Sequence, residues 1–561
     1  MGSTSFRTRA QAMSAAGRVA VGERTHRPRY LHSARGSRYE ARRGQTPVGE
    51  RPGALLQIAL FVLAAGLAAF TIVQGIAPHD EGLMLQAGAR IASGEWPYRD
   101  FWTNYPPGQP LVLAGLQEIF GVSLLAWRVL AVAVDAGVAL LAYRLAQRRA
   151  PEVYALGAWL AVASVMAFPM LPGPNPPALL LSFAALLAAR RRPGLAGAIA
   201  GLAVLFRFEL GVAAIAGVLL TAPRGRRARA LWPAVAVAVI SLAPFFVAAP
   251  HAMWHDTIGF YAIQDLQRLP FPIGFDGPWR PSKLIEFYIP LILVVGLGLW
   301  CLQMAVGHER RTVNARASMH GGIAAGPPAP GPDPEAWSLA PLALVGLGYL
   351  LGRTDVYHLV PLAAVLPVML ARTAAVARLA WLRVALLTAL ALIAIYGVER
   401  RAGQLLHPPA GAAVPGPAGD GVQTSPADAQ ALGGLESELA HITRPGEPVF
   451  VTDPRTDRVT AGDSLLYVIT GHPNATRYDV MQPGVLTTAP VQDEIVSSLK
   501  RSHTRVVVRW SDPRAEQSEA NGSSRSSGVH ILDAYLRSHF RPIARYGVYQ
   551  VLLARDTSRS P

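Results

Sequence analysis

Two adjacent carboxylates, Asp80 and Glu81, have the position in the sequence that a general base at a membrane surface needs. They follow an uncharged apolar segment, residues 54–76, which as a helix is long enough to cross a hydrocarbon core of about 30 Å. A carboxylate at this point could deprotonate the hydroxyl of a water-borne acceptor beside a lipid-anchored substrate. The alternative is that the pair only begins a solvated loop.

The loop that follows, residues 79–122, is rich in side chains that can bind a sugar. Aromatic rings can stack on a sugar ring, and a carboxylate can accept hydrogen bonds from its hydroxyl groups. The substrate-binding candidates in this loop are Tyr98, Asp100, Trp102 and Tyr105. On physical grounds alone, an aromatic belt at the membrane interface is the simpler interpretation of the rings.

Two charged residues, Arg207 and Glu209, lie between the short apolar segments 194–206 and 210–221. Ionisable groups at membrane depth are costly and normally face a cavity inside the protein. Glu209 is therefore a further substrate-binding candidate, although the two charges could equally neutralise each other.

The composition is that of a membrane protein. Hydrophobic residues make up 51% of the 561 residues and charged residues only 16%, against about 25% in soluble domains. This apolar content excludes disorder of the whole chain, and the single cysteine, Cys301, excludes a disulfide-stapled scaffold. Outside the arginine-rich residues 1–52, the basic residues behind the net charge of +16 lie largely in short clusters between apolar segments, as the positive-inside rule predicts. Because no basic–aromatic module accompanies them, we expect no nucleic-acid partner.

Eleven apolar segments predict a mostly α-helical, polytopic transmembrane bundle with its amino end inside and its carboxyl end outside. They cover residues 54–76, 124–145, 153–171, 178–189, 194–206, 210–221, 231–249, 284–306, 337–351, 359–370 and 379–398. The predicted catalytic part is 53–400. It has external loops at 79–122 and 250–283 and a cytoplasmic linker at 307–336, and a disordered basic cytoplasmic tail, 1–52, precedes it.

After a linker, residues 401–426, the composition becomes that of a soluble protein. Residues 427–561 alternate helical and β-rich runs, which predicts a small extracytoplasmic α/β domain. Helices are expected at 432–441, 491–499 and 529–540, strands at 448–452, 505–510 and 548–554, and either at 465–469. Residues 477–479 and 482–484 are expected to contact the membrane part.

The first loop and its flanks resemble a known family. The matching residues are Asp80-Glu81-Gly82, Gly94, Pro97-Tyr98, Asp100, Tyr105-Pro106-Pro107-Gly108, Gly121-Val122-Ser123 and Arg128. Their arrangement is similar to that in the GT-C superfamily of membrane glycosyltransferases, in the branch of the protein O-mannosyltransferases and aminoarabinose transferases. The resemblance covers approximately residues 54–400.

This resemblance implies a sugar donor linked to a polyprenyl phosphate, transfer to an external acceptor, and inversion at the anomeric carbon. Asp80 matches the family's catalytic base, and Glu81 lies beside it. The departing lipid phosphate needs compensating charge. The candidates for binding it are Arg353, His358, Arg128 and Arg207.

The candidates for the phosphate each have a structural alternative. Arg353 and His358 could belong, with Asp355, to a helix cap at the interface. Arg128 could pair with Asp135, two turns deeper in the same apolar segment.

No cofactor is certain from the sequence. Branches of the superfamily differ in their need for a divalent cation, and no ligand cluster in the sequence settles the point. His251, His255 and Asp256 could ligate a metal, although an interfacial helix is the simpler interpretation, and His530 looks isolated in the tail. Two rival interpretations remain open. A transporter or lipid flippase would line its path with Arg128, Arg207 and Glu209, and a non-catalytic scaffold would carry an external binding domain. The acceptor could be a protein, a glycan or a lipid.

Overall fold

The structure is a computed structural model. It describes residues 53–166, 173–260, 268–269, 284–299, 337–516, 521 and 525–555. The predicted cytoplasmic tail, the cytoplasmic linker 307–336 and most of the second external loop lie outside the described residues.

Each of the eleven predicted apolar segments coincides with an apolar helix in the described part of the chain. Four are long enough by themselves to cross a membrane: α5 (Leu124–Gln147), α10 (Arg227–Ala248), α16 (Val356–Val376) and α17 (Ala380–Leu406). The shorter ones are α2 (Ala54–Ala69), α6 (Glu152–Met166), α7 (Asn175–Ala188), α8 (Pro193–Val204), α9 (Phe208–Thr221), the helical segment Glu286–Leu299 and α15 (Ala340–Gly352). The mostly α-helical bundle is confirmed, while the number of crossings and their direction stay predictions.

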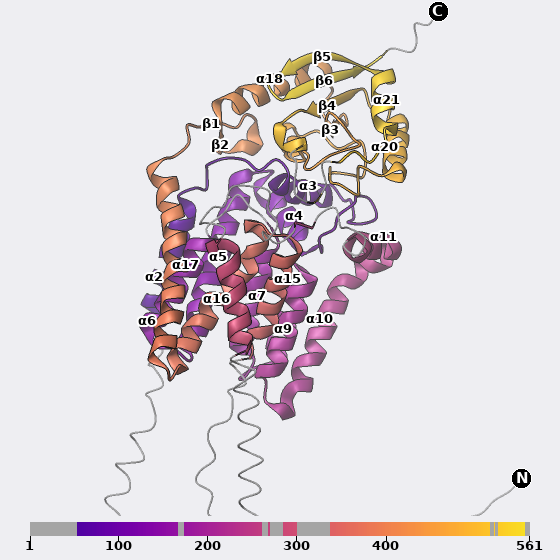
Figure 1. The fold of residues 1–561 in the computed structure, drawn as a ribbon. Coiled ribbons are helices and arrows are strands. Elements are labelled where there is room, and N and C mark those ends of the chain that lie inside the picture. The colour runs from indigo at the N-terminus through magenta and orange to yellow at the C-terminus, as the bar shows by residue number, and fades with distance from the viewer. Residues whose placement is uncertain are drawn as a thin grey trace, which may run out of the picture. The chain divides into compact units, whose positions relative to one another are not determined.

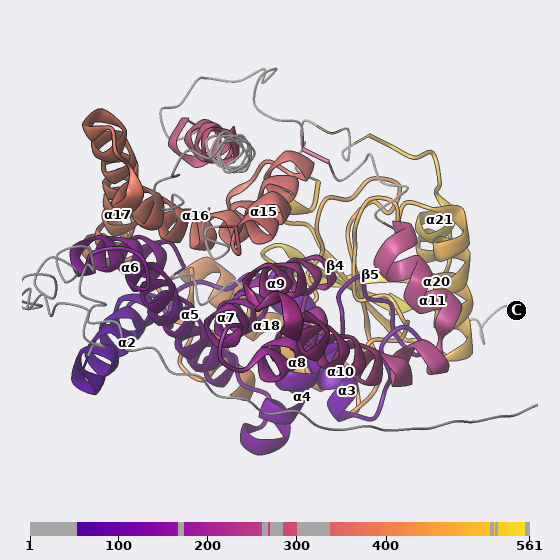
Figure 2. The same ribbon diagram turned by 90° about the horizontal axis from the view of Figure 1, so that it is seen from below.

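Small residues allow helices α8 and α10 to approach each other closely (Figure 2). A Cβ atom added at Gly197 of α8 would lie 1.9 Å from the carbonyl oxygen of Ala230 in α10. One added at Gly201 would lie 2.3 Å from the carbonyl oxygen of Ala234. The two backbones therefore touch, as they do in membrane helix pairs with small residues at the contact.

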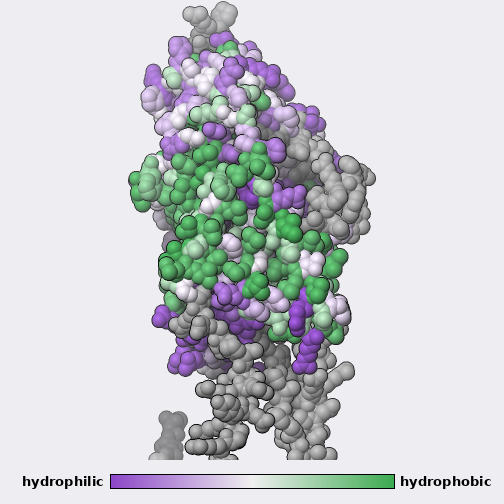
Figure 3. All heavy atoms as spheres, turned by 90° about the vertical axis from the view of Figure 1, so that its left-hand side faces the viewer, coloured by the Kyte–Doolittle hydropathy of each residue, from purple (hydrophilic) through white to green (hydrophobic). Residues whose placement is uncertain are grey.

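Figure 3 shows a broad apolar band across one side of the molecule, with hydrophilic surfaces above and below it. Helices α2 and α17, on that side in Figure 1, expose the large apolar residues Leu55, Ile58, Val62, Leu63, Trp381, Val384, Leu392 and Ile395. A surface of this kind would be unstable in water and fits contact with lipid.

The first apolar helix is shorter than the sequence predicts. Helix α2 ends at Ala69 instead of continuing to residue 76. The carbonyl oxygens of Ile72 and Gly75 accept hydrogen bonds from the guanidinium of Arg128, at 2.9 and 2.8 Å. The chain leaves the helix here because these carbonyls bind a side chain rather than backbone amides of a following turn.

The first loop folds into two helices, α3 (Asp80–Ala92) and α4 (Gly108–Phe120), which pack against each other. Figure 1 shows them between the apolar helices and the C-terminal region. Asp80 is therefore at the beginning of a helix and not in an extended loop.

The C-terminal region is the predicted small α/β unit. It contains helices α18 (Pro426–Ile442), α19 (Leu465–Thr470), α20 (Ala489–Arg501) and α21 (Ile531–His539), and strands β3 (Phe450–Thr452), β4 (Val506–Trp510), β5 (Phe540–Tyr546) and β6 (Tyr549–Ala554). The sheet has the order β3-β4-β6-β5, with β3 parallel to β4 and the other pairs antiparallel. Strand β5 was not predicted. It forms a hairpin with β6 whose turn has Gly547 at φ 54°.

Part of the segment predicted as a linker, 401–426, forms regular secondary structure. Helix α17 continues to Leu406, and strands β1 (Ala412–Ala413) and β2 (Gln423–Thr424) form an antiparallel pair. The backbone N–H of Gln423 donates to the carbonyl oxygen of Val73, at 2.6 Å. This bond fixes the linker to the chain that leads from α2 to α3.

Candidate active site

Asp80 and Glu81 begin helix α3, where the dipole of the helix favours negative charge. Successive helical residues point about 100° apart, and the two side chains have opposite environments. The Asp80 side chain is exposed, whereas Glu81 is completely buried. Only Asp80 is therefore accessible to a substrate in this arrangement.

Glu81 forms a bidentate ion pair with Arg128 of α5. The Arg128 Nε atom lies 2.8 Å from Oε1 of Glu81, and Nη2 lies 2.8 Å from Oε2. Both side chains are 0% exposed. Arg128 thus pairs with Glu81 and not with Asp135, because the first loop folds back onto the outer end of α5.

Two opposing effects act on the pKa of the Glu81 carboxyl. Burial raises its pKa, while the guanidinium of Arg128 and the backbone N–H of Ala77 lower it. The ion pair and the two carbonyls that Arg128 also binds tie the start of α3, the end of α2 and the start of α5 together. This arrangement fixes the position of Asp80, one residue away.

Helix α19 of the C-terminal region packs directly on α3. A Cβ atom added at Gly82 would lie 2.2 Å from the backbone nitrogen of Leu465. The N–H of Leu465 donates to the carbonyl oxygen of Pro78, at 3.0 Å. Glycine at position 82 is required for this contact, two residues after Asp80.

His79, immediately before Asp80, contacts the C-terminal region through both ring nitrogens. The backbone N–H of Gly462 donates to Nδ1 at 3.3 Å, and Nε2 of Gln482 lies 3.1 Å from Nε2 of the ring. Burial lowers the pKa of His79, and the charge of Arg353 lowers it further, against the effect of Asp80. The ring is therefore neutral at pH 7. The predicted contact of residues 482–484 with the membrane part is confirmed.

A second connection between the first loop and the C-terminal region is an ion pair of Arg90 with Asp479. Nη1 of Arg90 lies 3.1 Å from each carboxylate oxygen of Asp479, and its Nε donates to Glu95 at 2.8 Å. Both Arg90 and Asp479 are buried. The predicted contact of residues 477–479 is confirmed as well.

Arg353 and His358 meet at Asp355, the N-cap of α16. The Nε of Arg353 donates to Asp355 Oδ2 at 2.9 Å, and the backbone N–H of His358 donates to Oδ1 at 2.8 Å. The ring Nδ1 of His358 lies 2.7 Å from the same oxygen. The helix-cap interpretation of this group is therefore confirmed.

This cap lies within electrostatic range of the start of α3. Arg353 is near enough to His79 to act on its protonation, and Asp80 interacts electrostatically with the phenol of Tyr357, the second residue of α16. The structure thus brings the start of α3 and the cap of α16 within electrostatic range of each other, although they are far apart in the sequence.

Arg207 and Glu209 form the predicted ion pair, with Nη2 of Arg207 3.2 Å from Oε1 of Glu209. The hydroxyl of Tyr349, in α15, accepts from Arg207 Nε and donates to the same carboxylate. The guanidinium also lies over the rings of Tyr349 and Tyr105, at 4.9 and 5.6 Å from their centroids. Tyr349 packs against His358, with ring centroids 5.9 Å apart, which connects this group to the α16 cap.

The other predicted sugar-binding residues have mainly structural contacts. Tyr98 is fully buried, and its hydroxyl donates to the carbonyl oxygen of Tyr105 at 2.8 Å. Trp102 is buried, and its backbone N–H donates to the carbonyl oxygen of Arg477 at 2.9 Å. The carboxylate of Asp100 binds Arg99, which lowers the pKa of that carboxyl. Tyr105, beside Arg207, is the member of this set closest to the charged groups.

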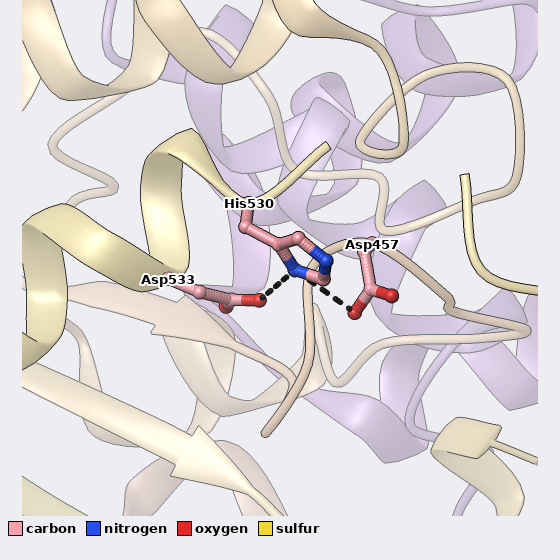
Figure 4. A group of neighbouring side chains, drawn as sticks. All are labelled: Asp457, His530 and Asp533. Atoms are coloured by element: carbon pink, nitrogen blue, oxygen red, sulfur yellow. Dashed lines mark ion pairs between the residues drawn. The ribbon is translucent and has the colours of Figure 1, made fainter. Parts of the chain in front are cut away.

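His530 is not isolated. Its Nδ1 lies 3.8 Å from Asp457 and 3.7 Å from Asp533 (Figure 4). Asp457 also binds Arg455 through both carboxylate oxygens, at 2.9 and 2.6 Å, which lowers the pKa of Asp457 to about 2. The group joins the start of α21 to the loop after β3 as an ion-pair cluster.

Two residues of the site were missed at the sequence level. Tyr349 lies inside an apolar segment, and nothing in the sequence signals that its hydroxyl binds Arg207 and Glu209. His79 directly precedes Asp80, and this adjacency was the available signal.

No family model matches the sequence, and no curated protein matches it significantly. Solved structures do match. ArnT from Cupriavidus metallidurans bound to undecaprenyl phosphate is 15% identical, with a TM-score of 0.50 over 90% of this chain and 99% of ArnT. The chain shares its fold with this ArnT, as the resemblance to the GT-C superfamily predicts. The apo state of the same ArnT also matches, with 15% identity over 91% of this chain and 99% of ArnT and a TM-score of 0.49. The Archaeoglobus fulgidus oligosaccharyltransferase in its apo form matches with 13% identity over 90% of this chain and 75% of that chain, with a TM-score of 0.48.

Proposed function

We propose that the protein is an integral membrane glycosyltransferase that moves a sugar from a polyprenyl-phosphate donor to an acceptor outside the cytoplasm. The observation that carries this proposal is the exposed carboxylate of Asp80 at the start of α3, within electrostatic range of the Arg353 cap, in a chain that shares its fold with ArnT. The ArnT structure with the same fold holds undecaprenyl phosphate, which supports a lipid phosphate as the carrier here.

Asp80 is the general base of this reaction. As the acceptor oxygen attacks the anomeric carbon, the carboxylate takes up the proton of the acceptor hydroxyl. A new carbon–oxygen bond forms to the acceptor, and the bond from the anomeric carbon to the phosphate oxygen breaks. The polyprenyl phosphate leaves with the bonding electrons, and attack from the opposite side inverts the anomeric centre.

The lipid phosphate is bound by the Arg353 group, with Arg207 and His358 close to it. These residues are connected through Tyr349 and can donate hydrogen bonds to the charge that develops on the leaving group. Arg128 and Glu81 take a positioning role instead, because their ion pair is completely buried. Tyr105 and Glu209 remain the sugar-binding candidates next to Arg207.

The C-terminal region lies over the start of α3 and contacts His79 and Arg90. We assign it to the external side, together with the active site, because the acceptor must reach Asp80. Its loops at Gly462 and Gln482 contact His79, the residue before the base.

The test replaces Asp80 with asparagine, which keeps the size of the side chain and removes the base. Cells that lack the gene receive the wild type, Asp80→Asn or Glu118→Gln, and their envelope glycans and polyprenyl-phosphate sugars are analysed by mass spectrometry. Glu118→Gln is a matched control, because Glu118 is an exposed carboxylate at the other end of the same loop region.

We expect Asp80→Asn to lower the transfer rate by about 10²–10⁴-fold at unchanged abundance and thermal stability, and Glu118→Gln to behave as the wild type. Transfer that survives in Asp80→Asn removes Asp80 from the mechanism. Lipid movement across the membrane without sugar transfer would favour the transporter interpretation.

A further inference from the structure

Two arginine-rich segments that are separate in the sequence meet at one end of the helix bundle. The first is the turn between α7 and α8, and the second is the short 3₁₀ turn Arg224–Arg226 together with the start of α10. Six exposed arginines of these segments form what is called the arginine patch below: Arg191, Arg192, Arg224, Arg226, Arg227 and Arg229.

The close contact between α8 and α10 brings the two segments together. A Cβ atom added at Gly194, near the start of α8, would lie 3.4 Å from the carbonyl oxygen of Arg229. Further along both helices, one added at Gly201 would lie 2.3 Å from the carbonyl oxygen of Ala234. Because the contact positions rise together along both helices, α8 and α10 run in the same direction. Their starts therefore lie side by side, and the arginines before and within them share one surface.

The charge of the arginine patch is not neutralised within the described residues. None of its six guanidinium groups forms an ion pair or a side-chain hydrogen bond with another part of the described chain. The buried arginines near the first loop differ, since Arg90, Arg128 and Arg207 each pair with a carboxylate. Like charges held on one surface repel one another, and an anionic partner would lower this repulsion.

The arginine patch borders a surface that fits the hydrocarbon of a bilayer. Leu231 and Val235 of α10 and Leu195 of α8 are exposed, and the exposed fraction of Trp232 is 70%. Tryptophan is enriched at the boundary between hydrocarbon and head groups, and long arginine side chains extend from there to the head groups. An anion bound to the patch would therefore lie at head-group level, with space for acyl chains along α10.

This patch lies at the opposite end of the bundle from the candidate active site. Helix α8 runs from the patch toward Arg207, whose guanidinium lies over the ring of Tyr105. Helix α10 runs from the patch to α11 (Pro250–Trp254) (Figure 1). Near that far end, Phe245 packs against Trp96 of the first loop, with ring centroids 5.5 Å apart. The patch is therefore separate from the residues assigned to sugar transfer.

We propose that the arginine patch is a binding surface for anionic phospholipids in the leaflet at this end of the bundle. A planar guanidinium can donate two parallel hydrogen bonds to the oxygens of one phosphate. Clusters of four to eight basic residues beside a membrane helix attract anionic lipids in this way. The inference goes beyond the proposed function and does not depend on it.

The structural alternative is that these arginines only determine the direction in which the helices insert, which requires no bound lipid. Lipid affinity separates the two roles. Phosphatidylglycerol, the zwitterionic phosphatidylethanolamine and inorganic pyrophosphate are each titrated onto the purified full-length protein in detergent, and dissociation constants are measured by native mass spectrometry. Pyrophosphate distinguishes a lipid site from a site for a free phosphate compound.

The test variant is Arg226→Gln/Arg227→Gln/Arg229→Gln. Its matched control is Arg501→Gln/Arg537→Gln/Arg541→Gln, which removes the same charge from exposed positions of the C-terminal region. We expect the test variant to bind phosphatidylglycerol about 10-fold to 100-fold more weakly than the wild type, and the control to bind like the wild type.

The wild type should bind phosphatidylglycerol more tightly than either of the other two compounds. Equal affinity of the test variant and the wild type for phosphatidylglycerol overturns the inference. So does a wild type that binds the two lipids equally. Pyrophosphate binding as tight as that of phosphatidylglycerol overturns the assignment to a lipid.

Should the triple substitution lower the abundance of the protein, Arg191→Gln/Arg192→Gln takes its place, with an expected loss of affinity of about 5-fold to 10-fold. A further measurement needs no variant. Raising the ionic strength from about 0.1 M to about 1 M shortens the Debye length from about 10 Å to about 3 Å, which should weaken binding of phosphatidylglycerol to the wild type. Binding that does not change with ionic strength overturns the inference.

Discussion

Arg128 and Glu81 form a completely buried, bidentate ion pair that connects helix α5 to the first turn of α3, next to the exposed Asp80. The pair explains why two neighbouring carboxylates have opposite environments. The Glu81 carboxylate is buried in its ion pair with Arg128, whereas the Asp80 carboxylate is exposed and is the candidate base.

Removing either partner of this pair should destabilise the protein, because the other charge would stay buried without compensation. We expect Arg128→Gln or Glu81→Gln to lower the free energy of unfolding by about 3–5 kcal/mol, measured as a lower thermal midpoint in lipid nanodiscs. The control is Arg99→Gln, in an exposed pair with Asp100, which should leave the midpoint nearly unchanged. A variant of the buried pair with wild-type stability would contradict this assignment.

Replacing Gly82 with alanine should loosen the C-terminal region from α3. The new Cβ would lie 2.2 Å from the backbone nitrogen of Leu465, and a backbone atom cannot move aside as a flexible side chain can. We expect faster cleavage between the two parts in limited proteolysis, and lower transfer activity. Gly115→Ala, in α4, is the matched control, since a Cβ there meets no atom within 4 Å. Equal protection of both variants would contradict the contact.

Protonation of His79 should make stability depend on pH. The pKa of His79 is lowered by burial, so below its ordinary value of about 6.5 the unfolded chain binds more protons than the folded one. The stability contributed by the neutral ring is complete above that pH and is lost on acidification. We expect the thermal midpoint to fall less between pH 7.5 and 5.5 in His79→Gln, which can still form hydrogen bonds but does not titrate, than in the wild type. Parallel curves would show that His79 carries no such effect.

Removal of divalent cations should not stop sugar transfer, because we assign the compensation of the phosphate charge to arginines. We expect EDTA to leave the transfer rate unchanged, with Arg353→Gln as the variant that does lower it. Within the described residues, the one His and carboxylate group with metal-ligand spacing is the cluster of Asp457, His530 and Asp533 in the C-terminal region. Loss of transfer in EDTA that Mg²⁺ or Mn²⁺ restores would contradict this expectation.

The sequence by itself determined the helical bundle and the C-terminal α/β region, and it singled out Asp80 as the candidate base. These follow from local properties: the length of apolar runs, the alternation of helical and β-rich segments, and a carboxylate pair directly after a membrane segment. The missed strand β5 shows the limit of local patterns, because its Phe540–Tyr546 run has no clear alternation of its own and is stabilised by pairing with β6.

Only the tertiary structure decided which charged side chains pair with each other. Glu81 and Arg128 are 47 positions apart, and Arg207 and Tyr349, which also bind each other, are 142 positions apart. Charges buried at membrane depth need partners, and those partners are chosen by how helices pack, which no single stretch of sequence specifies. The same packing leaves the Asp80 side chain exposed and buries the side chain of its neighbour Glu81.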